Sequence, residues 1–223
     1  MSVEKIIHQS WKTKEMDEVM AEWTSSVKAT FPTYEYKFWT DDDNDSFVKT
    51  HYPHFYDFYK NVLIPIERCD FVRYLYIYHY GGMYIDLDTK MQRPLELSGS
   101  SAYLIDQTKE ANVDRWPFLL DCFFVAGEKH SPFFYDLCQN IHRGTVYRLL
   151  SQSCRKEYYQ SLYRTGPFML TKFYLLNIGK YKVDILKDVF TTRRSEKDVK
   201  PKDQYHGVHM QWNTWMKPED RMR

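Results

Sequence analysis

Two aspartates separated by a single residue are the side chains most able to do chemistry in this sequence. Asp86 and Asp88 follow the short apolar run Met83–Ile85. In a regular strand both carboxylates would point to one face, about 7 Å apart, where they repel each other unless a cation lies between them. Oxygen ligands of this kind suit Mn²⁺ or Mg²⁺. The pair therefore predicts a divalent-metal site at a strand end; the alternative is two solvated carboxylates in a turn.

The segment before this pair has the features of a buried helix. Residues 65–80 begin with proline and have the length of about four turns, and their apolar side chains surround nearly the whole circumference. Gly81 and Gly82 then end the helix, because glycine accepts the left-handed conformation of a C-cap. Asp70 and Arg73 lie one turn apart on one face. They form either a structural ion pair or part of the site.

The remaining pattern predicts the elements that must position these residues. A strand at 5–10, a helix at 15–30 and a strand at 34–39 make a βαβ opening, and the acidic residues 41–45 read as a turn. Further strands are expected at 83–85, 102–105 and 123–126, and helices at 132–142, 157–162 and 168–176. The fold class is therefore α/β, one domain with a mostly parallel central sheet flanked by helices. Ligands bind at the carboxyl edge of such sheets.

Composition excludes several function classes. The formal net charge of +1 over 223 residues rules out a basic nucleic-acid-binding module, and the 17% aromatic content rules out a disordered chain. Four cysteines without a CxxC pair indicate buried thiols in a reducing compartment. No apolar stretch has the length of a signal peptide or a membrane span. A cytoplasmic protein is expected.

The same aspartates fit a second enzyme class. Residues 83–90 satisfy the hhhhDxDxT pattern of haloacid-dehalogenase-type phosphatases, in which Asp86 would attack phosphorus and Asp88 would act as acid and base. Those enzymes need a lysine and a paired acidic motif on later strands, whereas the acidic cluster 41–45 precedes the motif here.

Four separated motifs resemble those of glycosyltransferase family 32, and more distantly the clostridial glucosylating toxins. They are the opening strand Lys5–Trp11 (KIIHQSW), the core Asp70–Asp88 (D-x-x-R…G-G-x-Y-x-D-x-D), Thr165-Gly166-Pro167, and the closing segment His209–Trp215, where Thr214 replaces the usual serine. The resemblance implies a GT-A (Rossmann-like) catalytic domain over residues 1–215, and leaves 216–223 as a polar tail or chain end.

The resemblance also implies which residues hold the metal and the donor sugar. Asp88 would be a direct metal ligand, Asp86 would contact the metal through water and the ribose or sugar directly, and His209 would be the third protein ligand. Asp70 and Arg73 would bind the hydroxyls of the donor sugar, a task that suits a carboxylate and a rigid guanidinium fork.

The remaining donor contacts that the resemblance implies are His8, Gln9, Trp11, Tyr84, Gly166, Thr214 and Trp215. Trp11 would stack on the nucleobase, Tyr84 would support the donor beside the two aspartates, and Trp215 would cover the pyrophosphate as part of a closing lid.

The family retains the anomeric configuration, which implies a front-face reaction without an enzyme base. Asp121 departs from the pattern, since the family usually has asparagine there. An aspartate could serve as a general base in an inverting reaction, or it could simply start a strand.

We therefore expect a metal-dependent transferase that moves a hexose from a nucleotide-diphosphate sugar to a glycan or lipid-linked acceptor, as in polysaccharide biosynthesis. UDP-glucose or UDP-galactose is favoured as donor, with GDP-mannose as the other candidate, and the cofactor is Mn²⁺ or Mg²⁺. The alternatives are the phosphatase and a nucleotide-sugar-binding protein without turnover. The basic stretch 141–164 is either a solvated face or a contact for an anionic acceptor or a membrane surface.

Overall fold

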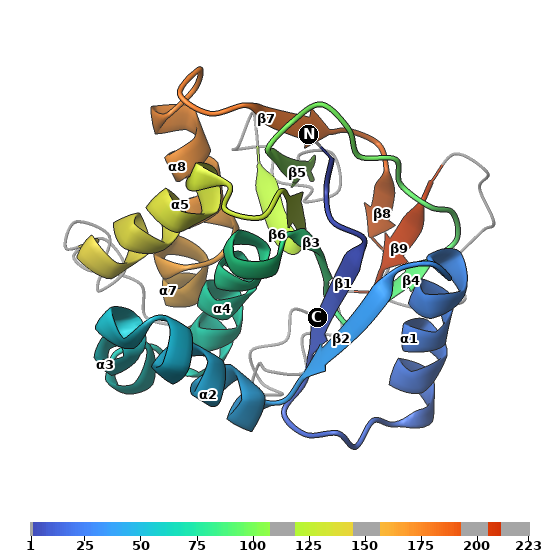
Figure 1. Ribbon diagram of the computed structural model, residues 1–223, viewed down its shortest axis with the longest axis horizontal. Helices are drawn as coiled ribbons and strands as arrows, with labels where there is room; N and C mark the ends of the chain where they lie inside the picture. The colour runs from blue at the N-terminus through green and yellow to red at the C-terminus, as the bar shows by residue number, and fades with distance from the viewer. Residues whose placement is uncertain (1, 108–118, 145–156, 193–204, 211–223) are drawn as a thin grey trace.

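The computed structural model describes residues 2–107, 119–144, 157–192 and 205–210 (Figure 1). A six-stranded sheet lies at its centre, in the order β2 (Glu35–Trp39), β1 (Ile6–Ser10), β3 (Gly82–Ile85), β6 (Leu120–Gly127), β5 (Ala102–Asp106) and β7 (Val183–Leu186). Only β6 runs antiparallel to its neighbours in this sheet. A second, smaller sheet has the order β4 (Thr89–Met91), β9 (Gly207–His209) and β8 (Phe190–Thr192).

All the described helices except α1 lie on one face of the central sheet, while α1 and the small sheet cover the other face (Figure 1). The described helices are α1 (Glu18–Thr30), α2 (Asp41–His51), α3 (Pro53–Asn61), α4 (Pro65–Tyr80), α5 (Pro132–Arg143), α7 (Glu157–Arg164) and α8 (Pro167–Leu176). Alternation along β3 divides the core: Tyr84 packs toward α4, whereas Met83 and Ile85 pack toward α1 and the small sheet. None of the helices in these ranges is long and apolar enough to cross a bilayer.

The predicted α/β architecture and most predicted elements are confirmed. The βαβ opening is parallel, with Ile7 opposite Tyr36 in the register of β1 and β2. The three short strands β4, β8 and β9 carry too few residues for a period-2 pattern, and the sequence did not indicate them.

The predicted turn at 41–45 is wrong, because these acidic residues begin α2. Thr40 is the N-cap: its hydroxyl accepts from the Asp43 N–H at 3.2 Å, and the Asp43 carboxylate accepts from the Thr40 N–H at 2.9 Å. This reciprocal capping box, together with negative charge at the positive end of the helix dipole, favours a helix start over a loop.

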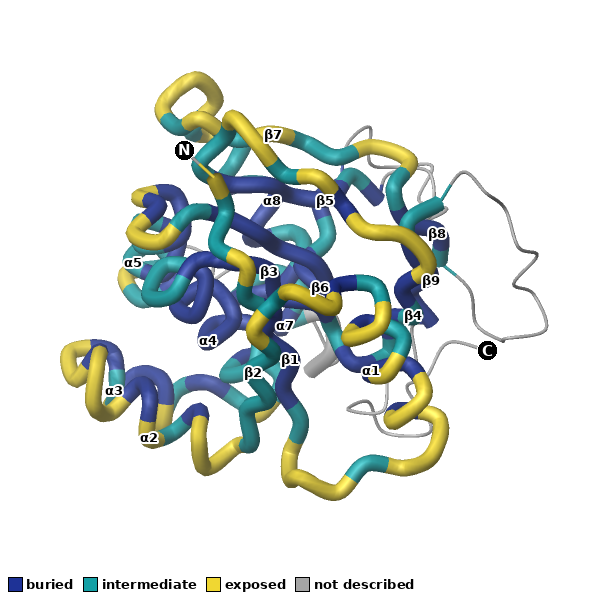
Figure 2. The backbone as a smooth tube through the Cα atoms, turned by 45° about the vertical axis from the view of Figure 1, so that its right-hand side comes forward, coloured by how far each residue is buried: buried dark blue, intermediate teal, exposed yellow. Residues whose placement is uncertain are grey.

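Helix α4 is the buried centre of the molecule, as Figure 2 shows by its dark colour beside β3 and β6. Gly81 and Gly82 end it with φ angles of 71° and 92°. A Cβ on Gly82 would lie 2.3 Å from the Ile6 carbonyl oxygen, closer than two such atoms can approach. The glycine pair therefore lets the chain turn directly from α4 into β3 beside β1.

Gly82→Ala is expected to lower the free energy of unfolding by at least about 2 kcal/mol, because the new methyl group pushes β3 away from β1. Gly179→Ala is the matched control. Gly179 also has a positive φ of 81°, but no atom lies within 4 Å of the place a Cβ would take, so this variant carries backbone strain alone, about 1 kcal/mol. Urea unfolding of both variants tests the difference, and equal losses would show that the contact with Ile6 is unimportant.

Candidate metal and donor site

Asp86, Asp88 and His209 come together at one edge of the central sheet. One ligand atom from each lies within 4.8 Å of the other two, and His209 Nε2 is 3.4 Å from Asp88 Oδ1. Two carboxylates and an imidazole at this spacing form a donor set that fits a divalent cation. The structure thus gathers the three residues predicted as metal ligands.

The two aspartates meet in a turn rather than along a strand. Strand β3 ends at Ile85, and the Thr89 N–H donates to the Asp86 carbonyl at 3.1 Å. The sequence-based geometry, with both carboxylates on one face of a regular strand, is therefore wrong. The turn is fixed on both sides, because the Asp86 N–H donates to Phe123 O and the Met210 N–H donates to Asp88 O, each at 2.8 Å.

Arg73, a residue of α4, contacts both Asp70 of the same helix and Asp86 of the metal site. Its Nη2 lies 3.1 Å from Asp70 Oδ1 and 3.2 Å from Asp86 Oδ1, and its Nη1 donates to the Cys122 carbonyl at 2.6 Å. The guanidinium also lies over the Tyr84 ring, 4.6 Å from its centre. Arg73 is 3% exposed, so its charge neutralises the carboxylates of Asp70 and Asp86 rather than facing water.

The Thr165-Gly166-Pro167 segment contacts Asp70 and fixes its carboxylate. The Thr165 hydroxyl donates to Asp70 Oδ2 at 2.9 Å, and the Tyr74 hydroxyl donates to the Thr165 carbonyl at 3.0 Å. A Cβ on Gly166 would lie 3.5 Å from the same Asp70 oxygen. Gly166 therefore lies beside Asp70, at the start of α8.

Burial and charge together shift the acid–base behaviour of the site. Burial raises the pKa of Asp86 to about 7; Asp88 adds to the increase, and Arg73 opposes it. Burial also raises the pKa of Asp70, against the opposing effect of Arg73. Burial lowers the pKa of His209, but the neighbouring carboxylates, Asp88 first, raise it further, so the net direction is upward. These shifts are those of a negatively charged site that a cation would relieve.

Of the predicted donor-binding residues, His8 and Gln9 lie inside the protein. His8 Nδ1 accepts from Trp39 Nε1 at 3.2 Å and Nε2 donates to Gly81 O at 3.0 Å, and burial lowers its pKa to about 4. Both ring nitrogens are thus bonded within the fold. The Gln9 side-chain amide donates to Ile85 O at 3.2 Å, and this hydrogen bond fixes the end of β3.

Trp11 and Tyr84 differ in their access to the edge of the central sheet that carries Asp86 and Asp88. Trp11 directly follows β1 and is half-buried. Its backbone N–H donates to the backbone carbonyl of Trp39 at 2.9 Å. This is the edge where β3 delivers Asp86. Tyr84 is buried; its hydroxyl is 2.9 Å from Ser10 Oγ and its ring lies under Arg73. Tyr84 therefore supports Arg73.

Asp121 begins the part of β6 that passes the site. Its Oδ1 accepts from the N–H groups of Cys122 at 2.7 Å and Phe123 at 3.4 Å. Its charge also acts on Asp70 and His209. Thr214, Trp215 and the predicted tail 216–223 lie outside the described residues, as do residues 145–156 of the basic stretch 141–164.

Some site residues were missed by the sequence reasoning. Thr165 stood in a recognised motif without a role, and the structure shows that it bonds Asp70. Phe123 stacks on His209 with ring centres 4.0 Å apart. No sequence signal marks Phe123, because only the packing of distant segments brings it to His209.

Mn²⁺ affinity is expected to fall about tenfold for each pH unit below 7, because protons compete for the ligands. Asp86 has a pKa raised to about 7, so its carboxylate is free for a cation above that pH and protonated below it. Calorimetric titration with Mn²⁺ at pH 8, 7 and 6 measures the slope. Asp86→Asn should flatten it, leaving only the contribution of the other ligands; an unchanged slope in this variant would contradict the assignment.

Comparison with known proteins agrees with this geometry. Residues 6–110 match the family described as glycosyltransferase sugar-binding region containing DXD motif. Mannosyl phosphorylinositol ceramide synthase SUR1 of Saccharomyces cerevisiae is 37% identical over 126 residues, 53% of this chain and 33% of that protein. Inositol phosphoceramide mannosyltransferase 3 of Schizosaccharomyces pombe is 31% identical over 173 residues, 76% of this chain and 44% of that protein. The chain thus spans less than half the length of these curated relatives.

Solved structures with little sequence identity share the fold. The PaToxG glycosyltransferase superposes with a TM-score of 0.59 at 14% identity, covering 79% of this chain and 70% of that one. The UDP-bound glycosyltransferase domain of the YGT toxin superposes with a TM-score of 0.57 at 8% identity, covering 83% of this chain and 80% of that one. With its GT-A fold and its DXD motif at Asp86–Asp88, inside the matched residues 6–110, this chain is similar to the DXD-containing sugar transferases of the glycosyltransferase family 32 type.

Proposed function

We propose that this protein transfers a mannosyl residue from a nucleotide-diphosphate sugar to the inositol phosphate headgroup of a lipid, in a reaction that depends on Mn²⁺ or Mg²⁺. The observation that supports it most is the convergence of Asp86, Asp88 and His209 beside Arg73 at the carboxyl edge of β3. An imidazole in the ligand set favours Mn²⁺ over Mg²⁺.

The chemistry of the donor fits this edge. Departure of the nucleoside diphosphate leaves negative charge on the pyrophosphate, and a divalent cation supplies Lewis-acid stabilisation there when bound. Asp86, Asp88 and His209 would hold the cation. Arg73 keeps Asp86 in place through its 3.2 Å contact and presents Asp70 beside it. Trp11 provides an aromatic face for the base at the end of β1.

The relatives favour mannose as the sugar. Some are named inositol phosphoceramide mannosyltransferases and others mannosyl phosphorylinositol ceramide synthases. These names make GDP-mannose the leading donor ahead of UDP-glucose and UDP-galactose. The same names favour a lipid acceptor with an inositol phosphate headgroup over a polysaccharide.

We infer that transfer proceeds with retention. One oxygen of Asp121 is engaged by two backbone N–H groups, at 2.7 Å and 3.4 Å, which supports a positioning role for this carboxylate rather than that of a mobile general base. The anomeric configuration of the product, read by NMR, tests this point.

The experiment that tests the proposed function is a titration followed by an assay. Calorimetry with GDP, UDP and their sugars, with and without Mn²⁺, identifies the donor base. The protein is then incubated with GDP-mannose and detergent-solubilised inositol phosphoceramide, and transfer is measured by mass spectrometry. We expect Mn²⁺-dependent GDP binding and a lipid product heavier by one hexose.

Other outcomes separate the alternatives. Nucleotide binding without hydrolysis or transfer would indicate a binding protein. Release of phosphate from p-nitrophenyl phosphate, with no nucleotide binding, would indicate the phosphatase. Transfer from UDP-glucose alone would keep the transferase and overturn the sugar assignment.

A further inference from the structure

Two buried polar atoms next to the metal site have no hydrogen-bond partner in the part of the chain that the structure describes. Among the described residues, neither Thr89 Oγ1 nor His209 Nδ1 is paired, although Thr89 is fully buried and His209 is 8% exposed. A buried polar group without a partner is costly. The two atoms belong to residues that lie directly opposite each other in β4 and β9.

The ladder between β4 and β9 places these two side chains close together. The Met210 N–H donates to Asp88 O and the Gln92 N–H donates to His206 O, each at 2.8 Å. Bonded and non-bonded pairs alternate in an antiparallel ladder, so Thr89 and His209 form a non-bonded pair, the kind whose side chains approach most closely.

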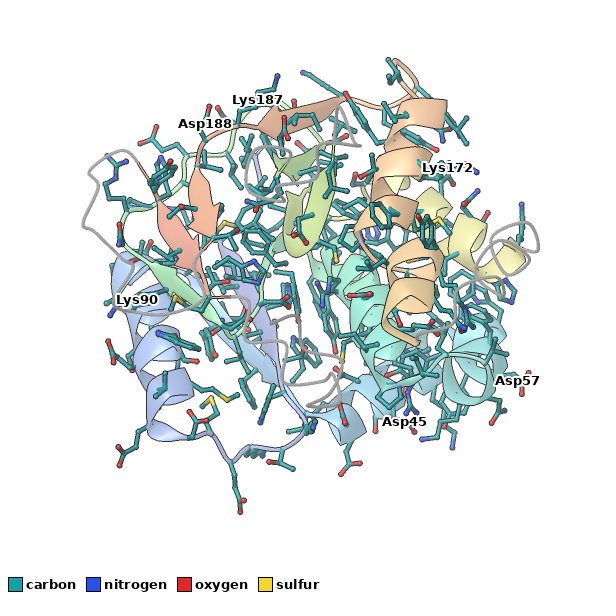
Figure 3. All side chains as sticks on the ribbon, turned by 180° about the vertical axis from the view of Figure 1, so that it is seen from behind. Asp45, Asp57, Lys90, Lys172, Lys187 and Asp188 are labelled. Atoms are coloured by element: carbon teal, nitrogen blue, oxygen red, sulfur yellow. The ribbon has the colours of Figure 1, made fainter. Side chains whose placement is uncertain are left out.

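Both side chains also point to the same side of the small sheet. Their neighbours face α1: Lys90, labelled in Figure 3, bonds Glu22 at 2.6 Å, and Val208 packs against Trp23. Thr89 and His209 therefore face the opposite way, toward Phe123 and the two aspartates.

Metal binding would create a need for a hydrogen bond at this position. His209 Nε2 is the nitrogen that faces Asp88, at 3.4 Å. An imidazole that binds a cation through Nε2 carries its proton on Nδ1, and that N–H needs an acceptor to fix the ring. The hydroxyl oxygen of Thr89 is an acceptor on the residue directly across the ladder.

We propose that Thr89 is a positioning residue for His209, whose Nδ1–H donates to Thr89 Oγ1 when the cation is bound. This inference rests on the cation site of the proposed function. It gives the residue after the DXD motif a task of its own, since Thr89 both closes the turn of Asp86 and orients the third ligand.

The test compares Mn²⁺ binding by three variants of the full chain. Thr89→Val keeps the branched shape and removes the acceptor, and should weaken the calorimetric Kd for Mn²⁺ by about 10- to 100-fold. Thr89→Ser restores the hydroxyl and should bind within about threefold of the wild type. Thr191→Val is the matched control: Thr191 also has a buried hydroxyl without a partner among the described residues, but it lies opposite Val208 on the α1 side. Its Kd should not change.

A second readout keeps the test independent of the fold and of activity. Nitrogen-15 NMR of Zn²⁺-loaded protein should show a slowly exchanging His209 Nδ1–H in the wild type and in Thr89→Ser, but not in Thr89→Val. Thermal unfolding without metal checks that every variant is folded.

Three results would overturn the inference. Equal Mn²⁺ affinity of Thr89→Val and wild type would remove the role of Thr89 while leaving the cation site intact. Equal losses in Thr89→Val and Thr191→Val would assign the effect to the small sheet as a whole. No Mn²⁺ binding by the wild type would overturn the cation site of the proposed function itself.

Discussion

Asp88→Asn is expected to reduce metal-dependent transfer by about 10³-fold while leaving the metal-free protein at least as stable as the wild type. The loss follows from the several kcal/mol that a Lewis acid contributes to departure of the pyrophosphate, at about 1.4 kcal/mol for each tenfold in rate. An amide oxygen is a far weaker ligand than a carboxylate, so Mn²⁺ binding should be lost with activity.

Whereas its activity falls, the metal-free Asp88→Asn variant should be at least as stable as the wild type. The folded pKa of Asp86 is raised by burial and by the charge of Asp88, so the metal-free wild type loses stability as pH rises from about 4, the ordinary pKa of an aspartate, through 7. Removing the Asp88 charge lessens this penalty. Thermal scans at pH 5 and 8, with and without Mn²⁺, should show a metal-dependent increase in Tm in the wild type but not in Asp88→Asn.

Asp57→Asn is the control for this pair of measurements. Asp57 is exposed on α3 at the edge of the molecule (Figure 3) and accepts a bond from Asn61 at 2.8 Å. It should retain activity and the Mn²⁺-dependent increase in Tm. Full activity of Asp88→Asn would contradict the proposed metal ligand set.

Arg73→Met is expected to lower the free energy of unfolding by about 3–5 kcal/mol, because it leaves two carboxylates near each other without their buried partner. For a chain of this size the loss corresponds to a Tm lower by about 10 °C. Arg73→Lys keeps the charge, but one ammonium cannot span Asp70, Asp86 and the Cys122 carbonyl as the guanidinium does. It should therefore fall between the wild type and Arg73→Met.

Two further variants make this result specific. Arg68→Met removes a half-exposed arginine from the same helix and should cost less than about 1 kcal/mol. Asp70→Asn in the Arg73→Met background removes one stranded charge and should recover part of the lost stability. Equal unfolding curves for Arg73→Met and Arg68→Met would show that the buried network contributes nothing to stability.

Much of the site could be predicted because its residues are close in sequence. Asp70, Arg73, Asp86 and Asp88 lie within one helix, one glycine turn, one short strand and the turn that follows it, so the spacing of the chain almost fixes their order in space. The buried helix, its glycine end and the carboxyl edge follow from apolar periodicity and the conformational freedom of glycine. The acidic start of α2 was wrongly predicted as a turn. A run of aspartates suits a turn and a helix N-terminus equally, and only the structure shows the capping contacts of Thr40 with Asp43.

By itself, then, the sequence determined the α/β class, the parallel opening, the helix that carries Asp70 and Arg73, and the position of the DXD motif after β3. The tertiary structure alone decided that the two aspartates meet in a turn and that Thr165 bonds Asp70 across 95 residues of chain. The family resemblance implied His209 as the third ligand, but only the structure shows that the pairing of β4 with β9 brings it there. The structure also decided that His8 lies inside the fold. The physical reason is that local order follows from short-range sterics and periodicity, whereas contacts between distant segments depend on the packing of the whole core.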